Sequence, residues 1–339
     1  MNVMNDRISI AMATFNGEKY LREQLDSIYS QTLLPNETVA VDDCSTDRTT
    51  EILEEYRIKK GLKYFVNKHN IGVIKNFEKA ISLCQGDYVA LSDQDDIWFP
   101  EKLEKSYNKL KDIENTSPAM ISSRSIYVDS EIKIYKKFES TVDSLEYYES
   151  LWGHGNSQGC TFMLNRKLIN HILPFPDGIT IHDSYISFVA AMIGYKYNMA
   201  EALMYYRHHE GNVLAKATSL KTKSFLNKLK DKEFLKEEFP NFISNNRFVN
   251  MRQAYKQQKE YINKERAFLI EKILSLKSSK YFIKKISIII SLSDISLKRR
   301  CKVLIFFVFS KIAKIYVNII IHVSNFIKRG KMGKKSGKK

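Results

Sequence analysis

The chain has 339 residues, of which 44% are hydrophobic and 27% are charged, a balance typical of a globular protein with a hydrophobic core and not of a disordered chain. Its length predicts about two domains, and its cysteines (Cys44, Cys84, Cys160 and Cys301) form no CxxC pair, which argues against a site of closely spaced cysteine ligands. The net charge of +16 is uneven, because residues 1–212 carry 23 Lys/Arg and 30 Asp/Glu whereas residues 213–339 carry 31 and 8.

The first 115 residues alternate between strand and helix patterns. Short apolar runs predict strands at 8–13, 38–41, 63–66 and 88–91. Apolar residues at helical spacing predict helices at 19–31, 48–59, 73–83 and 101–115. Ser45, Thr46 and Asp47 supply N-cap chemistry for the second of these helices, and Pro100 opens the fourth. This order indicates an α/β fold with a mainly parallel sheet that has helices on both faces.

The start of the chain has a short apolar run broken by polar residues, without a basic segment or a cleavage site. It therefore indicates a first strand and not a signal peptide, and we expect the catalytic face to be cytoplasmic.

Polar clusters follow three of the predicted strands at the point where each ends. They are Thr14-Phe15-Asn16, Asp42-Asp43 and Asp93-Gln94-Asp95-Asp96. In an open parallel sheet, ligands bind outside the carboxyl ends of the strands. We therefore expect the three clusters to converge on one edge of the sheet and to form the functional site.

The pattern changes beyond residue 119. Strands are predicted at 121–128, 161–164 and 202–206, with a helix at 184–193, and the pattern becomes helical from residue 216. The stretch 283–327 is rich in Ile, Phe and Val, with Lys or Arg between them. Because a spanning helix needs about 20 apolar residues, we expect amphipathic helices on an anionic membrane surface. A helical subdomain with a basic face and a true span are the alternatives.

The acidic cluster at residues 93–96 places three carboxylates within four residues, where they repel one another. A hard cation such as Mg²⁺ or Mn²⁺ would neutralise them, with a nucleotide diphosphate completing its oxygen ligands. The alternative is an acidic turn ahead of the helix that begins near Pro100. Asp42-Asp43 leaves a similar choice, between hydrogen bonds to a nucleobase or ribose and a set of helix-capping groups.

Six motifs in order resemble the family-2 glycosyltransferases over residues 7–213. They are SIAMATFNGEKYLREQLDSIYSQTLLPNETVAVDDCSTDRTTEIL, HNIGVIKNFEKAI, GDYVALSDQDDIWFPEKL, GCTFMLNRKL, HDSYISFVAAMIG and YRHHEGN. The form DQDDIW, with HD and YRxH later, is most similar to bacterial rhamnosyltransferase-like members that build surface polysaccharides. The resemblance implies a GT-A fold over residues 1–213 and an inverting, metal-dependent transferase. It leaves residues 214–339 as a helical, basic region.

The resemblance also assigns roles to individual residues. Thr14, Asn16 and Glu18 match the loop that holds base and ribose, and Asp43, with Asp42 beside it, matches the carboxylate that reads the base. The matches to a loop near the nucleotide are Asn70, Gly72, Lys75 and Asn76, with Lys75 near the diphosphate. Asp93 matches the ribose-side carboxylate of a DxD-type motif, and Asp95 matches the metal ligand.

Asp183 matches the general base, which must take the proton of the acceptor hydroxyl as the new bond forms. Without the resemblance, an N-cap is the favoured interpretation of Asp183. Arg207, His209 and Asn212 match a loop near the diphosphate or acceptor, and Trp98 is either a core residue or a platform for the sugar. The sequence departs from many relatives in having Ser184 after Asp183 and a second histidine, His208, beside His209.

The expected partners are a nucleotide-sugar donor (dTDP-rhamnose or a UDP-hexose), a lipid-linked glycan acceptor of the O-antigen or capsule type and the anionic inner face of the plasma membrane. An inactive scaffold with the same fold is one alternative function, although none of the expected carboxylates is missing. Nucleic-acid binding through the basic region is another, but the chain lacks the interleaved aromatic residues and motifs of that class, so we expect no nucleic-acid partner.

Overall fold

The computed structural model describes residues 6–112, 117–137, 144–145, 158–209 and 239–262, with single positions at 267, 270 and 271. Contacts divide the chain into two units, of which the first comprises residues 1–216 and 246–267. The second, residues 217–245 and 268–339, lies outside the described residues apart from the start of one helix and positions 270 and 271. The stretch 283–327, predicted to contact a membrane, falls outside them too.

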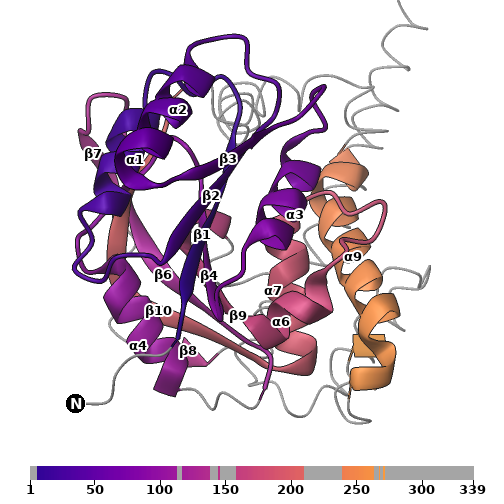
Figure 1. The fold of residues 1–339 in the computed structure, drawn as a ribbon. Coiled ribbons are helices and arrows are strands. Elements are labelled where there is room, and N and C mark those ends of the chain that lie inside the picture. The colour runs from indigo at the N-terminus through magenta and orange to yellow at the C-terminus, as the bar shows by residue number, and fades with distance from the viewer. Residues whose placement is uncertain are drawn as a thin grey trace, which may run out of the picture. The chain divides into compact units, whose positions relative to one another are not determined.

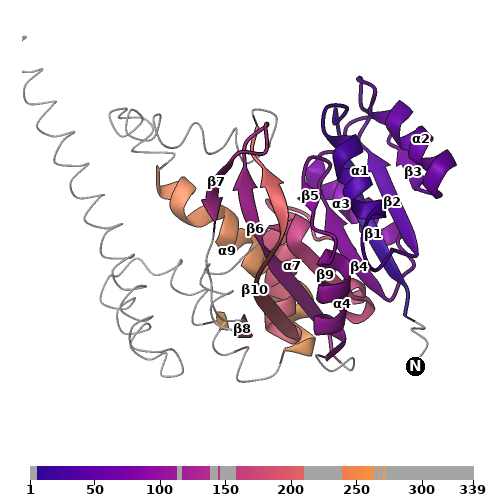
Figure 2. The ribbon, with the colours of Figure 1, turned by 90° about the vertical axis from the view of Figure 1, so that its left-hand side faces the viewer.

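The first unit is built on one mixed sheet in the order β3-β2-β1-β4-β9-β6-β10-β5 (Figures 1 and 2). Its strands are β1 (Ile8–Thr14), β2 (Glu37–Asp42), β3 (Lys63–Val66), β4 (Tyr88–Ser92), β5 (Ile97–Trp98), β6 (Ala119–Val128), β9 (Phe162–Asn165) and β10 (Tyr195–Arg207). Short strands β7 (Ile134–Lys137) and β8 (Ser144–Leu145) pair with β6 and β10. The first four strands are parallel, whereas β9 runs antiparallel to β4 and β6.

Helices cover both faces of the sheet, as Figure 1 shows. They are α1 (Leu21–Tyr29), α2 (Thr49–Lys60) and α4 (Lys102–Asp112) on one face, α3 (Val73–Leu83), α6 (Arg166–Ile172) and α7 (His182–Ile193) on the other, and α9 (Phe239–Gln258) outside α6 and α7. β1 and β4 are buried almost throughout, because helices lie on both sides of them. The predicted α/β class with a mainly parallel sheet is confirmed.

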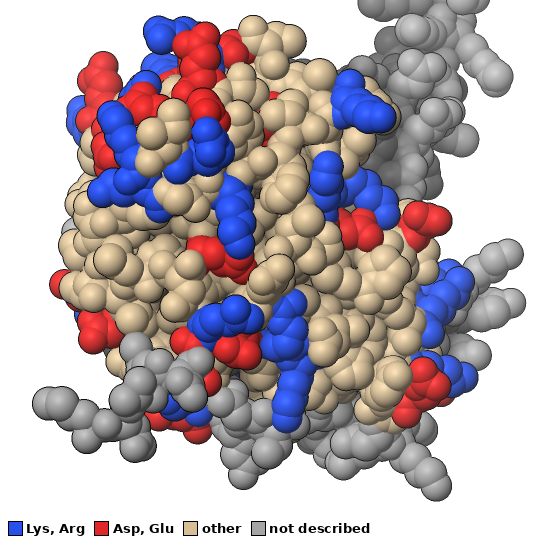
Figure 3. Space-filling view, in the orientation of Figure 1, with Lys and Arg blue, Asp and Glu red and all other residues tan. Residues whose placement is uncertain are grey.

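The surface over α1 and α2 carries interleaved charges of both signs (Figure 3). Ion pairs there join Arg22 to Glu55, Arg57 to Glu54 and Lys59 to Glu55. Exposed pairs of this kind contribute little stability individually. Because the two signs alternate, this surface is neither uniformly positive nor uniformly negative.

Two local predictions differ from the structure. Ser45 and Thr46 do not cap α2, because they bond to residues 16 and 42, and only Asp47 accepts the amide of Thr49, at 3.0 Å. β10 is longer than the predicted 202–206, because polar residues such as Lys196 and Asn198 are buried in it and interrupt the apolar pattern.

Within the described part of the chain, no helix has the length and apolar character needed to cross a bilayer.

Candidate active site

A cavity of about 460 Å³ opens at the edge of the sheet where β1, β2 and β4 end. Residues after all three strands line it, among them Thr14, Asp43, Asp93 and Asp95, so the three polar clusters converge as expected. The N-terminal turn of α3 forms one wall and the N-terminal turn of α7, with Asp183, forms another. Seven residues predicted for the site therefore share one cavity, namely Thr14, Asp43, Asn70, Gly72, Asp93, Asp95 and Asp183.

Asp43 fixes the loop that leads into α3. Its two carboxylate oxygens accept the amides of Ile71 and Gly72, each at 2.8 Å, and Oδ1 also accepts the side chain of Asn67 at 2.9 Å. Gly72 adopts a φ of 83°, a backbone conformation that favours glycine. The buried carboxylate therefore sets the start of α3, whose first amides point toward the cavity end of the helix.

The structure does not bring three predicted donor-binding residues to the cavity. Asp42 is fully buried, and its oxygens accept from Thr14 Oγ1 at 2.9 Å and from Ser45 Oγ at 2.6 Å. Asn16 and Glu18 accept the backbone amides of Thr46 and Arg48. These side chains join the loop after β1 to the loop after β2. They therefore stabilise the two loops and do not line the cavity.

The acidic cluster after β4 is electrostatically strained. Burial and the carboxylates of Asp95 and Asp183 raise the pKa of Asp93 to about 7. Burial, followed by Asp95 and Asp93, raises the pKa of Asp96 well above its ordinary value. Burial also raises the pKa of the Cys160 thiol, which lies against Asp93 and Asp96. Concentrated negative charge of this kind favours a bound cation.

The cluster fits a hard divalent cation. Ligand atoms of Asp93, Asp96 and Cys160 lie within 4.8 Å of one another, and Asp96 Oδ2 lacks a hydrogen-bond partner among the described residues. Carboxylate oxygens suit Mg²⁺ or Mn²⁺, whereas a thiol that burial keeps protonated is a poor ligand for either ion. Asp95, on the cavity wall, is the carboxylate through which such an ion would reach a bound ligand.

His209 lies beside this cluster, with Nε2 at 2.8 Å from Asp95 Oδ2 and its ring centre 4.7 Å from that of Tyr20. Arg207, which the resemblance places near the diphosphate or acceptor, is not among the residues that line the cavity. Its guanidinium is buried, where it bonds to the carbonyls of Asp95 and Ser130 and to Glu23. Arg207 therefore holds the backbone of the acidic loop.

Trp98 is a core residue, the first of the two interpretations that the sequence left open. Its side chain is 2% exposed in β5, and the ammonium of Lys102 lies 4.1 Å from the ring centre. The pairing of β5 with β10 turns the indole inward, since Met204 faces Trp98 in that ladder.

Asp183 stands in the first turn of α7, on the cavity wall. His182 Nε2 lies 2.7 Å from Asp183 Oδ1, and the imidazole stacks on Phe77 with ring centres 4.3 Å apart. Burial lowers the pKa of His182, but Asp183 and then Asp93 outweigh it, so the net shift is upward. The two side chains therefore form a close pair at the cavity wall.

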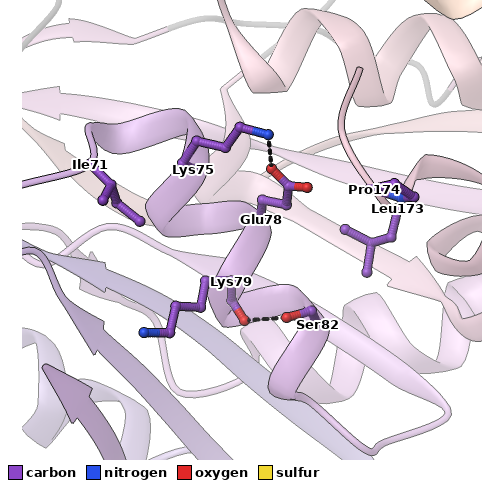
Figure 4. Close-up of a pocket in the computed structure, with 7 residues that line it drawn as sticks. All are labelled: Ile71, Lys75, Glu78, Lys79, Ser82, Leu173 and Pro174. Atoms are coloured by element: carbon purple, nitrogen blue, oxygen red, sulfur yellow. Dashed lines mark hydrogen bonds and ion pairs between the residues drawn. The ribbon is translucent and has the colours of Figure 1, made fainter. Parts of the chain in front are cut away.

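Lys75 also lies away from this cavity. Figure 4 shows it in a second, shallower pocket of about 520 Å³ between α3 and Leu173-Pro174. Its ammonium pairs with Glu78 at 2.7 Å, one turn further along α3. Helical spacing of three residues brings the two charges together, and this pairing turns Lys75 from the predicted diphosphate position.

Two residues of the site had no predicted role. Gln94 accepts the amide of Phe15 at 2.8 Å and donates to its carbonyl at 3.0 Å, so it ties the loop after β1 to the acidic loop. A Cβ on Gly159 would lie 2.4 Å from Asp183 Oδ1. Glycine is therefore required where the backbone approaches Asp183. The GC at 159–160 was visible as a motif, but its contact with Asp183 is tertiary.

Comparisons with known proteins bear on the family and on the fold. The model of the family described as Glycosyl transferase family 2 matches residues 9–173. The dTDP-rhamnosyl transferase RfbG of Shigella flexneri is 29% identical over 257 residues, which cover 70% of this chain and 86% of RfbG. The putative teichuronic acid biosynthesis glycosyltransferase TuaG of Bacillus subtilis is 29% identical over 49% of this chain and 64% of TuaG.

Solved structures show the same fold. S. aureus TarS 1-349 in complex with UDP-GlcNAc has a TM-score of 0.52 at 20% identity, over 85% of this chain and 80% of TarS. The complex of TarS 1-349 with UDP has a TM-score of 0.51 at 18% identity, over 81% of this chain and 93% of TarS. These likenesses identify the sheet and its flanking helices as a GT-A fold.

Proposed function

We propose that the chain, whose residues 9–173 match the model of glycosyl transferase family 2, moves a sugar from a nucleotide-activated donor to a growing bacterial surface glycan. The observation that carries the proposal is one cavity lined by Asp43, Asp93, Asp95 and Asp183. The name of TuaG supports a role in the synthesis of a surface polymer, and the name of RfbG favours dTDP-rhamnose as donor, with a UDP-hexose as the alternative.

The donor lies along the edge of the sheet in this proposal. The base and ribose occupy the side of the cavity near Asp43, Asn70 and Thr14, and the diphosphate faces the first turn of α3. Backbone amides and the helix dipole favour negative charge at a helix N-terminus. Lys75 and Arg207 do not line the cavity, so in this proposal neither side chain contacts the donor.

Asp95, with Asp93 beside it, would hold a divalent cation, Mg²⁺ or Mn²⁺, and the bound ion would stabilise the charge that develops on the departing diphosphate. His209 contacts Asp95 and orients its carboxylate. Arg207 fixes the loop backbone through the carbonyl of Asp95. These two residues support the acidic cluster and do not touch the sugar.

Asp183 is the general base in this account. It takes the proton of the acceptor hydroxyl while the acceptor oxygen bonds to the anomeric carbon and the bond to the diphosphate breaks. Attack from the side opposite the diphosphate inverts the anomeric configuration. His182 Nε2 lies 2.7 Å from Asp183 Oδ1 and so fixes the place of this carboxylate at the cavity wall.

Turnover of nucleotide sugars tests the function. The full-length protein, incubated with dTDP-rhamnose, UDP-glucose, UDP-galactose or UDP-GlcNAc, is expected to release nucleoside diphosphate from one of them in Mn²⁺ and from none after EDTA. Mn²⁺ restored to the EDTA-treated sample should restore the release. Equal release with and without metal would contradict the metal role, and no release from any donor, with lipid-linked glycan present, would contradict the function.

The acceptor is a lipid-linked glycan in this proposal, and the enzyme reaches it from the inner face of the plasma membrane. Residues 213–339, with 31 Lys/Arg against 8 Asp/Glu, support an anionic membrane partner. Each basic residue near such a surface contributes about 1 kcal/mol. The full-length protein is expected to float with vesicles containing phosphatidylglycerol and to be released by salt. Equal flotation with neutral phosphatidylcholine vesicles would contradict the electrostatic attachment.

A further inference from the structure

The segment between α6 and α7, residues 173–181, is irregular and forms part of the cavity wall. Thr180 and Ile181 line the cavity and lead directly into His182 and Asp183. A segment without regular structure has no ladder of its own, so its backbone carbonyls need partners from elsewhere. The position of Asp183 therefore depends on what holds this segment.

Four amide side chains on one side of α9 supply those partners. Asn250 Nδ2 donates to the carbonyl of Ile181 at 3.1 Å, and Gln253 donates to that of Asp177 at 2.9 Å. Gln257 donates to Pro174 O at 3.0 Å, and Gln258 donates to His171 O at 2.6 Å. The helix thus follows the whole connection from the last turn of α6 to the start of α7, one amide at a time.

Asn250 is the fully buried end of this series and the amide nearest to Asp183. Its Oδ1 accepts the backbone amide of Thr180 at 2.8 Å, so both sides of its carboxamide are bonded to residues on the cavity wall. Residues 250, 253, 257 and 258 have the spacing of one helix face. Met251 and Ala254 are buried as well, which fixes the helix against the domain.

We propose that α9 is a positioning element for the active site, and that Asn250 holds the Thr180–Ile181 backbone so that Asp183 points into the cavity. The inference rests on the proposed function for the role of Asp183, but the contacts do not depend on it. The helix α9 would thus contribute to catalysis although it lies outside residues 9–173, the part of the chain that the family model matches.

Asn250→Ala in the full-length protein, compared with Lys256→Ala on the exposed side of the same helix, tests the proposal. Loss of the two backbone bonds is expected to speed hydrogen exchange of the amides of residues 180–183 about tenfold in Asn250→Ala alone. For the donor that wild type turns over, kcat is expected to fall about ten- to a hundredfold with little change in donor KM, because a misplaced base slows chemistry and not binding.

Each outcome decides the proposal. If hydrogen exchange at residues 180–183 is unchanged in Asn250→Ala, or is equally faster in Lys256→Ala, Asn250 does not hold the Thr180–Ile181 backbone. If exchange is faster but kcat is unchanged, α9 has no role in catalysis. If Asn250→Ala does not fold, Gln253→Ala, at a half-buried position, must show the same pattern at smaller size. If wild type is inactive but the expected difference in hydrogen exchange is found, the transferase function is contradicted and the role of Asn250 in holding the backbone is retained.

Discussion

Replacing Asp183 by asparagine is expected to lower sugar transfer by about 10²- to 10⁴-fold, the contribution typical of a general base. The amide has nearly the shape of the carboxylate, so it fits against Gly159 as Asp183 does. It cannot take a proton from the acceptor hydroxyl. Because Asp183 acts on the acceptor in this account, the affinity for UDP or dTDP in Mn²⁺, measured by calorimetry, is expected to stay within about twofold of wild type.

Asp177→Asn is the matched control for this variant. Asp177 is an exposed carboxylate in the same segment before α7, and only its backbone carbonyl is bonded to α9. It should transfer sugar at the rate of wild type. Normal transfer by Asp183→Asn would remove the base assignment, and loss of nucleotide affinity would indicate that Asp183 serves the donor.

Asp95→Asn is expected to reduce turnover by about 10²- to 10³-fold, the scale on which lost stabilisation of developing charge is felt. The amide keeps one oxygen for His209 but carries no charge for a cation. Mn²⁺ should therefore no longer stimulate the variant. Glu101→Gln, which removes an exposed carboxylate at the start of α4, should respond to Mn²⁺ as wild type does.

The first half of the fold could be predicted because its signals are local. β1, β2, β3 and β4 each coincide with a short apolar run, and the polar residues follow where those runs stop. Parallel order then brings the three clusters to one edge whatever the details of packing. Asp43, Asp93 and Asp95 line the same cavity for this reason. Asp183 lines it too, but it lies in α7, and only the motif similarity singled it out.

The direction of individual side chains could not be predicted, because it is set by tertiary partners. Arg207 carries the charge of a phosphate ligand, yet Glu23 and two carbonyls hold it beneath the acidic loop. Lys75 is drawn to Glu78 on its own helix. Asp42 and Asp43 are adjacent in sequence, but strand alternation points them to opposite sides, so only Asp43 reaches the cavity.

The sequence predicted helices beyond residue 216, but the boundary predicted at 213/214 gave no hint that α9 packs with the first unit. The sequence around Asn250 is polar, and the composition of residues 214–339 suggested a separate basic region. The structure places residues 246–267 in the same compact unit as residues 1–216, because buried amides attach the helix to backbone carbonyls. Amide contacts of this kind leave no hydrophobic period for a sequence pattern to detect.

Anomalous scattering from Mn²⁺, in crystals of the full-length protein soaked with UDP or dTDP, shows where metal and nucleotide bind. We expect a manganese peak at the carboxylate of Asp95, with the nucleoside diphosphate in the cavity between Asp43 and the first turn of α3. No peak should appear at that position in Asp95→Asn. Nucleotide and metal bound instead in the pocket beside Lys75 and Leu173, or manganese absent from Asp95 with nucleotide present, would contradict this expectation.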